Sequence, residues 1–411
     1  MAKAATKLNA PAKKPKVKAI TVAMTGNAGC ALAMKQINPD VVAAYPITPQ
    51  TTIVEEFATY VANGAVDTEY VNVESEHSAM SACIGASAAG ARVMTTTSSQ
   101  GLALMWEELS IASAMRLPIV MHNVNRALSG PINIHCDHSD SMGARDMGWV
   151  QMFGETAQEA YDNTIIAIRV AEHEKVLLPV MIMHDGFITS HAIDRFDVLE
   201  DDVVKKFVGE YEPKQALLNI DDPKTFGPFA MPAYYFEQRR QLREALDGAK
   251  DIVLKVSKEY GKLTGRSYGL FEEYRLDDAH IAIVVMGSTA GTAKYVVDQA
   301  RAKGIKVGLL KLRLFRPFPA AEIAEALSHL KAVAVMDRAD SIGALGGPVY
   351  MEVKAALYNS KKRPHVQGYV YGLGGRDTGP DQIETVIDDL KKIARGTEAP
   401  REQVTFLGVK G

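Results

Sequence analysis

Glu76 is the residue of this chain that its neighbours place best for acid–base chemistry. It precedes residues 78–91, in which every side chain except Met80 and Ile84 belongs to Ala, Gly, Ser or Cys. A helix this slim lets a flat ligand approach closely, and an acid at its start is then held against that ligand. The alternative is that Glu76 only stabilises the positive end of the helix dipole, which is worth about 0.3–1 kcal/mol and which Glu74 could do equally well.

Three further motifs carry polar groups at the ends of expected strands. Thr48 lies in AYPITPQ (residues 44–50), where two prolines stiffen the loop. Ser99 belongs to TTTSSQG (residues 95–101), whose hydroxyls suit a polar pocket wall. Arg126 carries a guanidinium, the natural bidentate receptor for a carboxylate. The simpler interpretations are that Thr48 and the hydroxyls cap helices and that Arg126 forms a surface ion pair.

Cysteine and histidine usage gives no sign of a metal centre. Cys30, Cys83 and Cys136 lie more than fifty residues apart, which fits neither a disulfide framework nor an iron–sulfur cluster. We expect three buried thiols in a reducing cytoplasm. Residues 133–140 combine His, Cys and Asp without a strict ligand spacing, so we expect a polar loop over the active centre and no metal held by this chain alone.

The elements that must position these groups alternate between strand and helix patterns. Expected strands cover residues 41–44, 70–73, 92–96, 118–123 and 180–184, and expected helices begin near Asn27 (as N-cap), Thr52, Ser78 and Glu155. This alternation predicts an α/β fold with a parallel sheet, in which ligands bind at the carboxyl ends of the strands.

A second α/β unit follows. Its expected strands cover residues 281–286, 307–312, 332–336 and 368–371, and its last helix begins within residues 378–380. The turn at residues 287–292 lacks the GxGxxG pattern, which disfavours dinucleotide binding.

The chain of 411 residues is long enough for two domains. We expect a basic tail at residues 1–19, a first domain at 20–200, a connector with a long amphipathic helix at 201–279, and a second domain at 280–411. The tail is either solvated or a docking arm for a partner subunit. A net charge of -3 disfavours nucleic acid and anionic membranes as partners. No uncharged apolar run reaches the roughly 18 residues of a membrane span.

Several motifs, in order, resemble the alpha subunits of the 2-oxoacid:ferredoxin oxidoreductase family, of the pyruvate type. The first part of the chain contributes AYPITPQ, VESEHSAMSACIGASAAGAR, TTTSSQG, NRALSGP and HDGFITSH, and the second part contributes YGLFEEYRLDDA, LLKLRLFRPFP and DRADSIGALGGP. The resemblance covers nearly the whole chain except the tail. It implies a thiamine diphosphate fold, with a pyrimidine-binding domain followed by a transketolase C-terminal-like domain.

The resemblance also implies roles. Glu76 matches the glutamate that hydrogen-bonds N1′ of the aminopyrimidine of thiamine diphosphate. Thr48 and Arg126 match residues that contact the 2-oxoacid, and we expect Pro46 and Ser99 to line the cofactor. The chemistry is the CoA-dependent oxidative decarboxylation of pyruvate to acetyl-CoA and CO2, with electrons passed to ferredoxin.

The family builds its Mg²⁺-diphosphate site from a GDG run, which is absent here; His184-Asp185-Gly186 is the nearest string and is interpreted as a strand-end turn. The resemblance therefore implies that a beta subunit holds the diphosphate and Mg²⁺, and that further subunits, of gamma and delta type, carry the [4Fe-4S] clusters.

Three alternatives remain open from the sequence. The chain could belong to a 2-oxoglutarate or branched-chain 2-oxoacid enzyme, to a scaffold that has lost its chemistry, or to the beta chain of a 2-oxoacid dehydrogenase. The presence of Thr48, Glu76 and Arg126 disfavours the scaffold.

Overall fold

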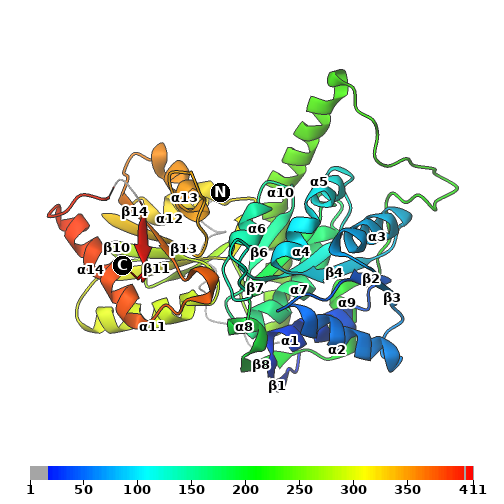
Figure 1. Ribbon diagram of the computed structural model, residues 1–411, viewed down its shortest axis with the longest axis horizontal. Helices are drawn as coiled ribbons and strands as arrows, with labels where there is room; N and C mark the ends of the chain where they lie inside the picture. The colour runs from blue at the N-terminus through cyan, green and yellow to red at the C-terminus, as the bar shows by residue number, and fades with distance from the viewer. Residues whose placement is uncertain (1–16, 402–403, 411) are drawn as a thin grey trace.

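The computed structural model describes residues 17–401 and 404–410, so most of the expected basic tail lies outside the described residues. Within the described part of the chain, the strands form one seven-stranded sheet, one six-stranded sheet and a two-stranded ribbon. The two larger sheets lie side by side, each with its own helices (Figure 1). This is the α/β class predicted from the strand–helix alternation.

The first sheet has the order β12-β6-β7-β5-β4-β2-β3. Its strands are β2 (Val41–Ala44), β3 (Glu69–Asn72), β4 (Val93–Thr97), β5 (Val120–Asn125), β6 (Val150–Phe153), β7 (Val180–Asp185) and β12 (Leu314–Arg316). All neighbours pair in parallel except β12, which pairs antiparallel with β6. The central strands β4, β5 and β7 are buried along their whole length; each begins with apolar residues and carries polar residues toward its carboxyl end.

Helices cover the faces of this sheet. They are α1 (Gly26–Ile37), α2 (Thr51–Ala62), α3 (Glu76–Ala89), α4 (Ser99–Leu104), α5 (Trp106–Ala114), α6 (Ser139–Gly143), α7 (Ala157–Ala171), α8 (Ile188–His191) and α9 (Asp201–Val208). The ribbon pairs β1 (Ile20–Thr25) with β8 (Ile193–Val198) in antiparallel orientation.

The second sheet has the order β15-β14-β13-β10-β11-β9. Its strands are β9 (Phe271–Tyr274), β10 (Ile281–Val285), β11 (Val307–Leu312), β13 (Ala332–Asp337), β14 (His365–Tyr371) and β15 (Thr405–Leu407). Helices α11 (Thr289–Ala302), α12 (Ala320–Leu327), α13 (Pro348–Tyr358) and α14 (Pro380–Arg395) cover it. A short 3-10 turn, Leu373–Gly375, follows β14.

Every expected strand is present, and the boundaries shift by up to three residues at one end. Some strands were not expected. β1, β6, β8, β12 and β15 correspond to no expected run, and β6 and β12 are short and carry no clear pattern. β9 and α9 lie within the region expected to be a connector. The domain boundaries at residues 200 and 279 stay predictions, because β12 from the second part of the chain completes the sheet of the first.

The N-cap assignment for the first helix was wrong. Thr25, not Asn27, caps α1, and the Thr25 hydroxyl accepts a hydrogen bond from the backbone N–H of Ala28. Asn27 is fully buried, and its amide donates to the Pro49 carbonyl and to the Thr52 hydroxyl. It therefore ties α1 to the loop that carries Thr48.

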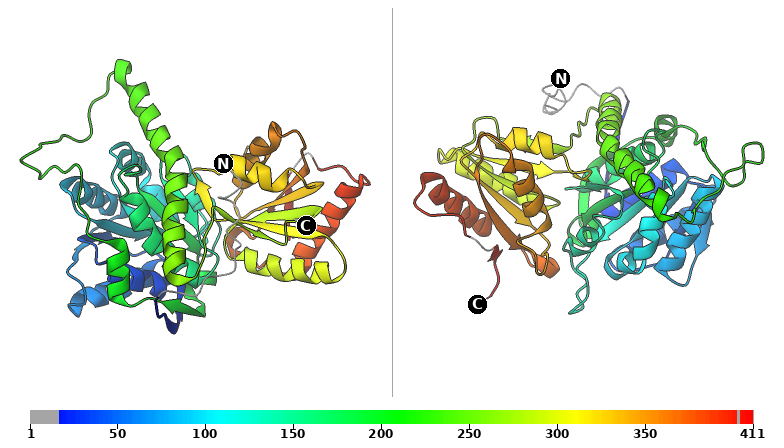
Figure 2. Two further views of the ribbon diagram at one scale, coloured as in Figure 1. Left: turned by 180° about the vertical axis from the view of Figure 1, so that it is seen from behind. Right: turned by 90° about the horizontal axis from the view of Figure 1, so that it is seen from above.

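The long connector helix, predicted at residues 234–260, is α10 (Pro232–Thr264). Its buried residues begin only at Leu242, and its first turns project away from the rest of the molecule (Figures 1 and 2). Tyr234, Tyr235 and Phe236 are exposed there. The second half of α10 packs on α7 and thereby joins the first domain.

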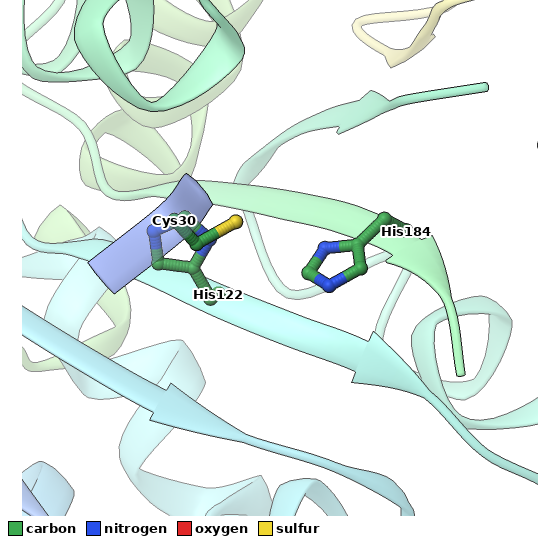
Figure 3. Close-up of side chains that lie close together, drawn as sticks. All are labelled: Cys30, His122 and His184. Carbon is green, nitrogen blue, oxygen red and sulfur yellow. The ribbon is translucent and has the colours of Figure 1, made fainter. Parts of the chain in front are cut away.

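All three cysteines are buried and unpaired, as expected. Cys30 lies beside His122 and His184, between α1 and the sheet (Figure 3). Among the described residues, no helix combines the length and the apolar character needed to cross a bilayer.

Candidate active site

The predicted site residues follow neighbouring parallel strands. Thr48 comes after β2, Glu76 after β3, Ser99 after β4 and Arg126 after β5. β3, β2, β4 and β5 are consecutive in the sheet, so their carboxyl ends form one edge. Loops at such an edge commonly build ligand sites in α/β folds.

Glu76 is the first residue of α3, and Ser75 caps that helix by accepting a hydrogen bond from the Ser78 N–H. Only 6% of Glu76 is exposed. Burial raises the pKa of its carboxyl above the ordinary value. Burial thus disfavours the charged form of this carboxyl, which is the direction expected of a group that shares a proton with a cofactor ring.

The Glu76 carboxylate packs against Gly101 in α4, where a side chain would clash with it. A Cβ built on Gly101 would lie 2.6 Å from Glu76 Oε1 and 2.4 Å from Thr97 Oγ1. Any larger side chain would displace the carboxylate, so the glycine of the TTTSSQG motif shapes the site.

The loop that carries Thr48 is held from several sides. The Gln50 side chain accepts from the Ile47 N–H at 3.0 Å and donates to the Thr96 carbonyl at 3.0 Å. Helix α2 begins at Thr51 with Gln50 in the cap position. The interpretation of Thr48 as a helix cap is therefore wrong, and its exposed side chain makes no hydrogen bond within the described residues. Pro46, also exposed, lies two residues before it.

Arg126 is buried, with 7% of its surface exposed. Its Nη1 donates to the Thr48 carbonyl at 2.9 Å, and its Nε donates to the Asn133 carbonyl at 3.1 Å. The expected surface ion pair is therefore wrong, because the guanidinium binds carbonyl oxygens inside the fold. Within the described part of the chain, Nη2 makes no hydrogen bond. Thr48 and Arg126 are thus brought together. The Thr48 hydroxyl and Arg126 Nη2 are both left able to donate a hydrogen bond to a ligand.

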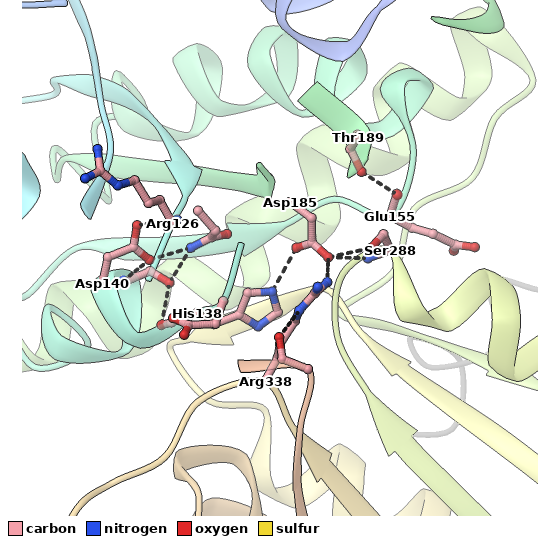
Figure 4. Close-up of polar contacts among 12 residues, drawn as sticks. Arg126, His138, Asp140, Glu155, Asp185, Thr189, Ser288 and Arg338 are labelled. Atoms are coloured by element: carbon pink, nitrogen blue, oxygen red, sulfur yellow. Dashed lines mark hydrogen bonds and ion pairs between the residues drawn. The ribbon is translucent and has the colours of Figure 1, made fainter. Parts of the chain in front are cut away.

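Asp140 organises this corner, and the sequence pattern did not reveal it. Its buried carboxylate accepts from Asn123 and Asn125 side chains at 3.0 and 2.8 Å, and from the backbone N–H groups of Ser99 and Arg126 at 3.0 and 3.1 Å. Figure 4 shows it beside Arg126. Burial raises the pKa of Asp140, while these donors act in the opposite direction. One carboxylate therefore fixes the ends of β4 and β5.

Ser99 is fully buried with a positive φ of 46°. Its hydroxyl donates to the Ala127 carbonyl at 2.6 Å. The neighbouring Ser98 hydroxyl donates to the Val124 carbonyl at 2.7 Å, so these two hydroxyls join β4 to β5 rather than cap α4. Contact of Ser99 with a cofactor stays a prediction.

A second polar cluster joins the two sheets (Figure 4). Asp185 at the end of β7 receives His138 Nε2 at 2.8 Å, Arg338 Nη1 at 3.0 Å and the Ser288 N–H at 3.0 Å. Burial would raise the pKa of Asp185, but His138 and Arg338 outweigh it and hold the pKa well below its usual range. The HDG string thus serves as a buried junction between the domains.

The donor set fits the pyrimidine end of thiamine diphosphate. A buried carboxyl faces a position kept free by Gly101, and α3 beside it consists almost wholly of small residues. The sequence has no GDG run for a diphosphate and its Mg²⁺. Glu76 would hold the ring nitrogen, and the groups that bind the diphosphate and Mg²⁺ would come from outside this chain.

Comparisons with known proteins agree with this geometry. Residues 32–258 match the thiamine diphosphate-binding domain of the pyruvate flavodoxin/ferredoxin oxidoreductases, and residues 279–383 match core domain II of pyruvate:ferredoxin oxidoreductase. Two solved structures have the same fold. A 2-oxoglutarate:ferredoxin oxidoreductase from Magnetococcus marinus has a TM-score of 0.69 at 20% identity, covering 92% of this chain and 66% of that one. A split-gene transketolase beta4 tetramer has a TM-score of 0.53 at 14% identity, covering 91% and 98%.

Curated relatives are much more similar in sequence. Pyruvate synthase subunit PorA of Thermotoga maritima is 56% identical over 90% of this chain and 94% of its own length, and PorA of Methanocaldococcus jannaschii is 50% identical over the same shares. Ketoisovalerate oxidoreductase subunit VorA of Pyrococcus abyssi is 43% identical over 94% of this chain and 97% of its own length. The chain therefore belongs to the pyruvate flavodoxin/ferredoxin oxidoreductase family of thiamine diphosphate-binding proteins.

Proposed function

We propose that this chain is the alpha-type subunit of a pyruvate synthase, which oxidises pyruvate with CoA to acetyl-CoA and CO2 and passes two electrons to ferredoxin. The contact that supports this most directly is Arg126 Nη1 to the Thr48 carbonyl, at the same sheet edge as the buried Glu76. It supports the proposal because it joins a guanidinium that could receive a carboxylate to the Thr48 loop, at the strand edge that Glu76 also follows.

The residues would divide the work as follows. Thiamine diphosphate, when bound, supplies a carbanion and accepts electrons from the substrate. Glu76 would share a proton with the pyrimidine ring nitrogen, because burial shifts this carboxyl toward its protonated form. Arg126 directs Nη2 at the substrate carboxylate, and Thr48 donates its hydroxyl to the 2-oxoacid. Pro46 would lie against the cofactor.

Partner subunits would complete the site. Large apolar side chains are exposed on α4 and α5, which follow β4 (Leu104, Trp106 and Ile111), and on the loop after β5 (Leu128, Ile132 and Ile134). Exposed apolar side chains that form a contiguous surface are typical of protein–protein contacts. A beta subunit seated there would bring the Mg²⁺-diphosphate site, and gamma and delta-type partners would carry the [4Fe-4S] clusters.

The relatives include subunits of enzymes with different substrates, since a ketoisovalerate oxidoreductase subunit is among them. The choice of 2-oxoacid therefore needs its own argument. Identity is higher to the pyruvate synthase subunits, at 50 and 56%, than to that subunit, at 43%. Pyruvate is therefore the proposed substrate, and a 2-oxoglutarate or branched-chain 2-oxoacid is the second candidate.

The test uses the complex purified from its native host. Pyruvate, 2-oxoglutarate and 3-methyl-2-oxobutanoate are each supplied with CoA and viologen dye, and pyruvate should give the highest kcat/KM. Glu76→Gln should keep the complex assembled but lose most of its turnover. Glu74→Gln is the matched control, because Glu74 lies two residues away, exposed at the same helix end. Near-normal pyruvate oxidation by the Glu76→Gln complex would refute the assigned role.

A further inference from the structure

Cys30, His122 and His184 form a buried cluster that the proposed reaction does not use. Cys30 lies on α1, His122 on β5 and His184 on β7. None of the three is exposed to solvent, and one potential ligand atom from each lies within 4.8 Å of the others. Figure 3 shows the Cys30 sulfur directed between the two imidazole rings.

The hydrogen bonds around His184 fix its tautomer. Its Nε2 lies 2.8 Å from Asn27 Oδ1. The Asn27 amide nitrogen donates to the Pro49 carbonyl and the Thr52 hydroxyl, so the amide orientation is set and Oδ1 acts as an acceptor. His184 Nε2 must therefore carry the proton. Its Nδ1 is left with a bare lone pair and has no hydrogen-bond partner among the described residues.

His122 follows the same logic. Its Nε2 lies 3.4 Å from the Thr164 hydroxyl, which itself donates to the Ala160 carbonyl at 2.8 Å. The hydroxyl is therefore an acceptor toward His122, and Nε2 carries the proton. His122 Nδ1 is the second bare, buried nitrogen without a partner in the described part of the chain.

Two unpartnered imidazole nitrogens beside one thiol are unusual in a protein interior. A buried acceptor without a donor destabilises the fold, and the single proton of Cys30 can serve only one of the two nitrogens. Burial lowers the pKa of His122 to about 3 and that of His184 to about 4, so both rings are neutral. Neutral imidazole is the form that binds metals, and its other nitrogen is commonly held by a hydrogen bond, as both are here.

We propose that Cys30, His122 and His184 bind one thiophilic metal ion, with Cu(I) preferred to Zn(II). Binding forms one metal–sulfur and two metal–nitrogen bonds and releases the Cys30 thiol proton to solvent. Thiolate and imidazole ligands suit both metals. Cu(I) with one thiolate leaves the site neutral, whereas Zn(II) leaves one positive charge where none of the three residues is in contact with water. The sequence pattern did not indicate this site, because the three ligands come from α1, β5 and β7, which are far apart in the chain.

The site has one connection to the proposed active centre. Asn27 holds His184 on one side and the Pro49 carbonyl on the other, and Pro49 follows Thr48. An ion that fixes His184 would therefore also steady the Thr48 loop.

The experiment uses the full-length chain, prepared metal-free under anaerobic conditions and titrated with Cu(I) against the chelator bicinchoninate. One equivalent of Cu(I) should bind per chain, and X-ray absorption should report one sulfur and two nitrogen ligands. Cys30→Ser, which nearly conserves volume, and His184→Gln should each weaken binding at least 100-fold. Cys83→Ala is the matched control, because Cys83 is an equally buried thiol in the same domain without a histidine partner in the metal-ligand clusters of the described residues.

Circular dichroism verifies that each variant is folded before titration. Failure of the folded wild-type chain to bind one equivalent of Cu(I), or equal affinity in folded Cys30→Ser, would overturn the proposal. A parallel titration with Zn(II) tests the choice of metal. Tighter binding of Zn(II) than of Cu(I) would overturn the preference argued from charge.

Discussion

Gly101 lies against the carboxyl group of Glu76, so closely that a Cβ on the glycine would be 2.6 Å from Glu76 Oε1. The position of the proposed cofactor-activating group thus depends on the missing side chain of a residue twenty-five positions further along the chain. Mutations that leave Glu76 itself unchanged can therefore test its role.

Gly101→Ala should displace the Glu76 carboxylate and lower kcat about 100-fold, because misplacing a reacting group by about 1 Å has an effect of this size. Pyruvate-dependent dye reduction by the assembled complex measures it. Gly85→Ala on α3 is the control, since a Cβ there meets nothing within 4 Å. Full activity of the Gly101→Ala complex would show that the added methyl group does not displace the Glu76 carboxylate.

Arg126→Lys should raise KM for pyruvate about 10-fold to 100-fold, because a charged hydrogen bond contributes about 1.5–3 kcal/mol and lysine cannot reproduce the planar fork. The KM for CoA should not change. Steady-state kinetics with each substrate varied in turn will measure both constants. An unchanged KM for pyruvate would mean that the guanidinium only braces the Thr48 loop.

Asp140→Asn should destabilise the first domain by about 3 kcal/mol, because an amide cannot accept from all the donors that meet at this carboxylate. Thermal unfolding of the full-length chain measures the loss. Asp146→Asn is a suitable control, since the Asp146 side chain is 71% exposed. Equal melting temperatures for the two variants would contradict the central role of Asp140.

Glu76→Gln should raise the melting temperature at pH 8 and change it less at pH 4. The folded-state pKa of Glu76 lies above the unfolded value, so the folded chain binds more protons. Stability is then highest below the unfolded pKa and falls as the pH rises toward the folded pKa. Glutamine cannot ionise, so the variant does not lose the stability that the parent loses when Glu76 becomes charged at high pH. A variant that is less stable at pH 8 than the parent would reverse the assigned direction.

Trp106→Ala should weaken assembly with the partner subunit about 30-fold or more, since a buried interface tryptophan typically contributes 2 kcal/mol or more. Trp106 is 45% exposed and is the first residue of α5, five residues after Gly101. Sedimentation of the reconstituted complex measures the affinity. Tyr295→Ala on α11 of the other domain is the control, because Tyr295 is also exposed. If both variants bound the partner subunit with the same affinity, Trp106 would not lie in the interface.

Local patterns in the sequence predicted the strands and the polar groups that follow them. β4, β5 and β7 each begin with apolar residues and are fully buried, so the sheet edge that Thr48, Glu76 and Arg126 follow could be predicted. Asp140 was not, because its importance comes from backbone N–H groups of loops that meet only after folding. Asn27 was misjudged for a similar reason, since its partners Pro49 and Thr52 lie on another element.

The first sheet cannot be completed during synthesis until the short strand β12 has been made, because β12 comes from the second part of the chain. β6, the strand beside it, lacks its outer neighbour until residues 314–316 have left the ribosome. A nascent N-terminal domain therefore exposes an unpaired sheet edge, the feature that most readily recruits other chains. Shortened genes that end before β12 should yield protein that aggregates, even when every residue of the proposed active site is present.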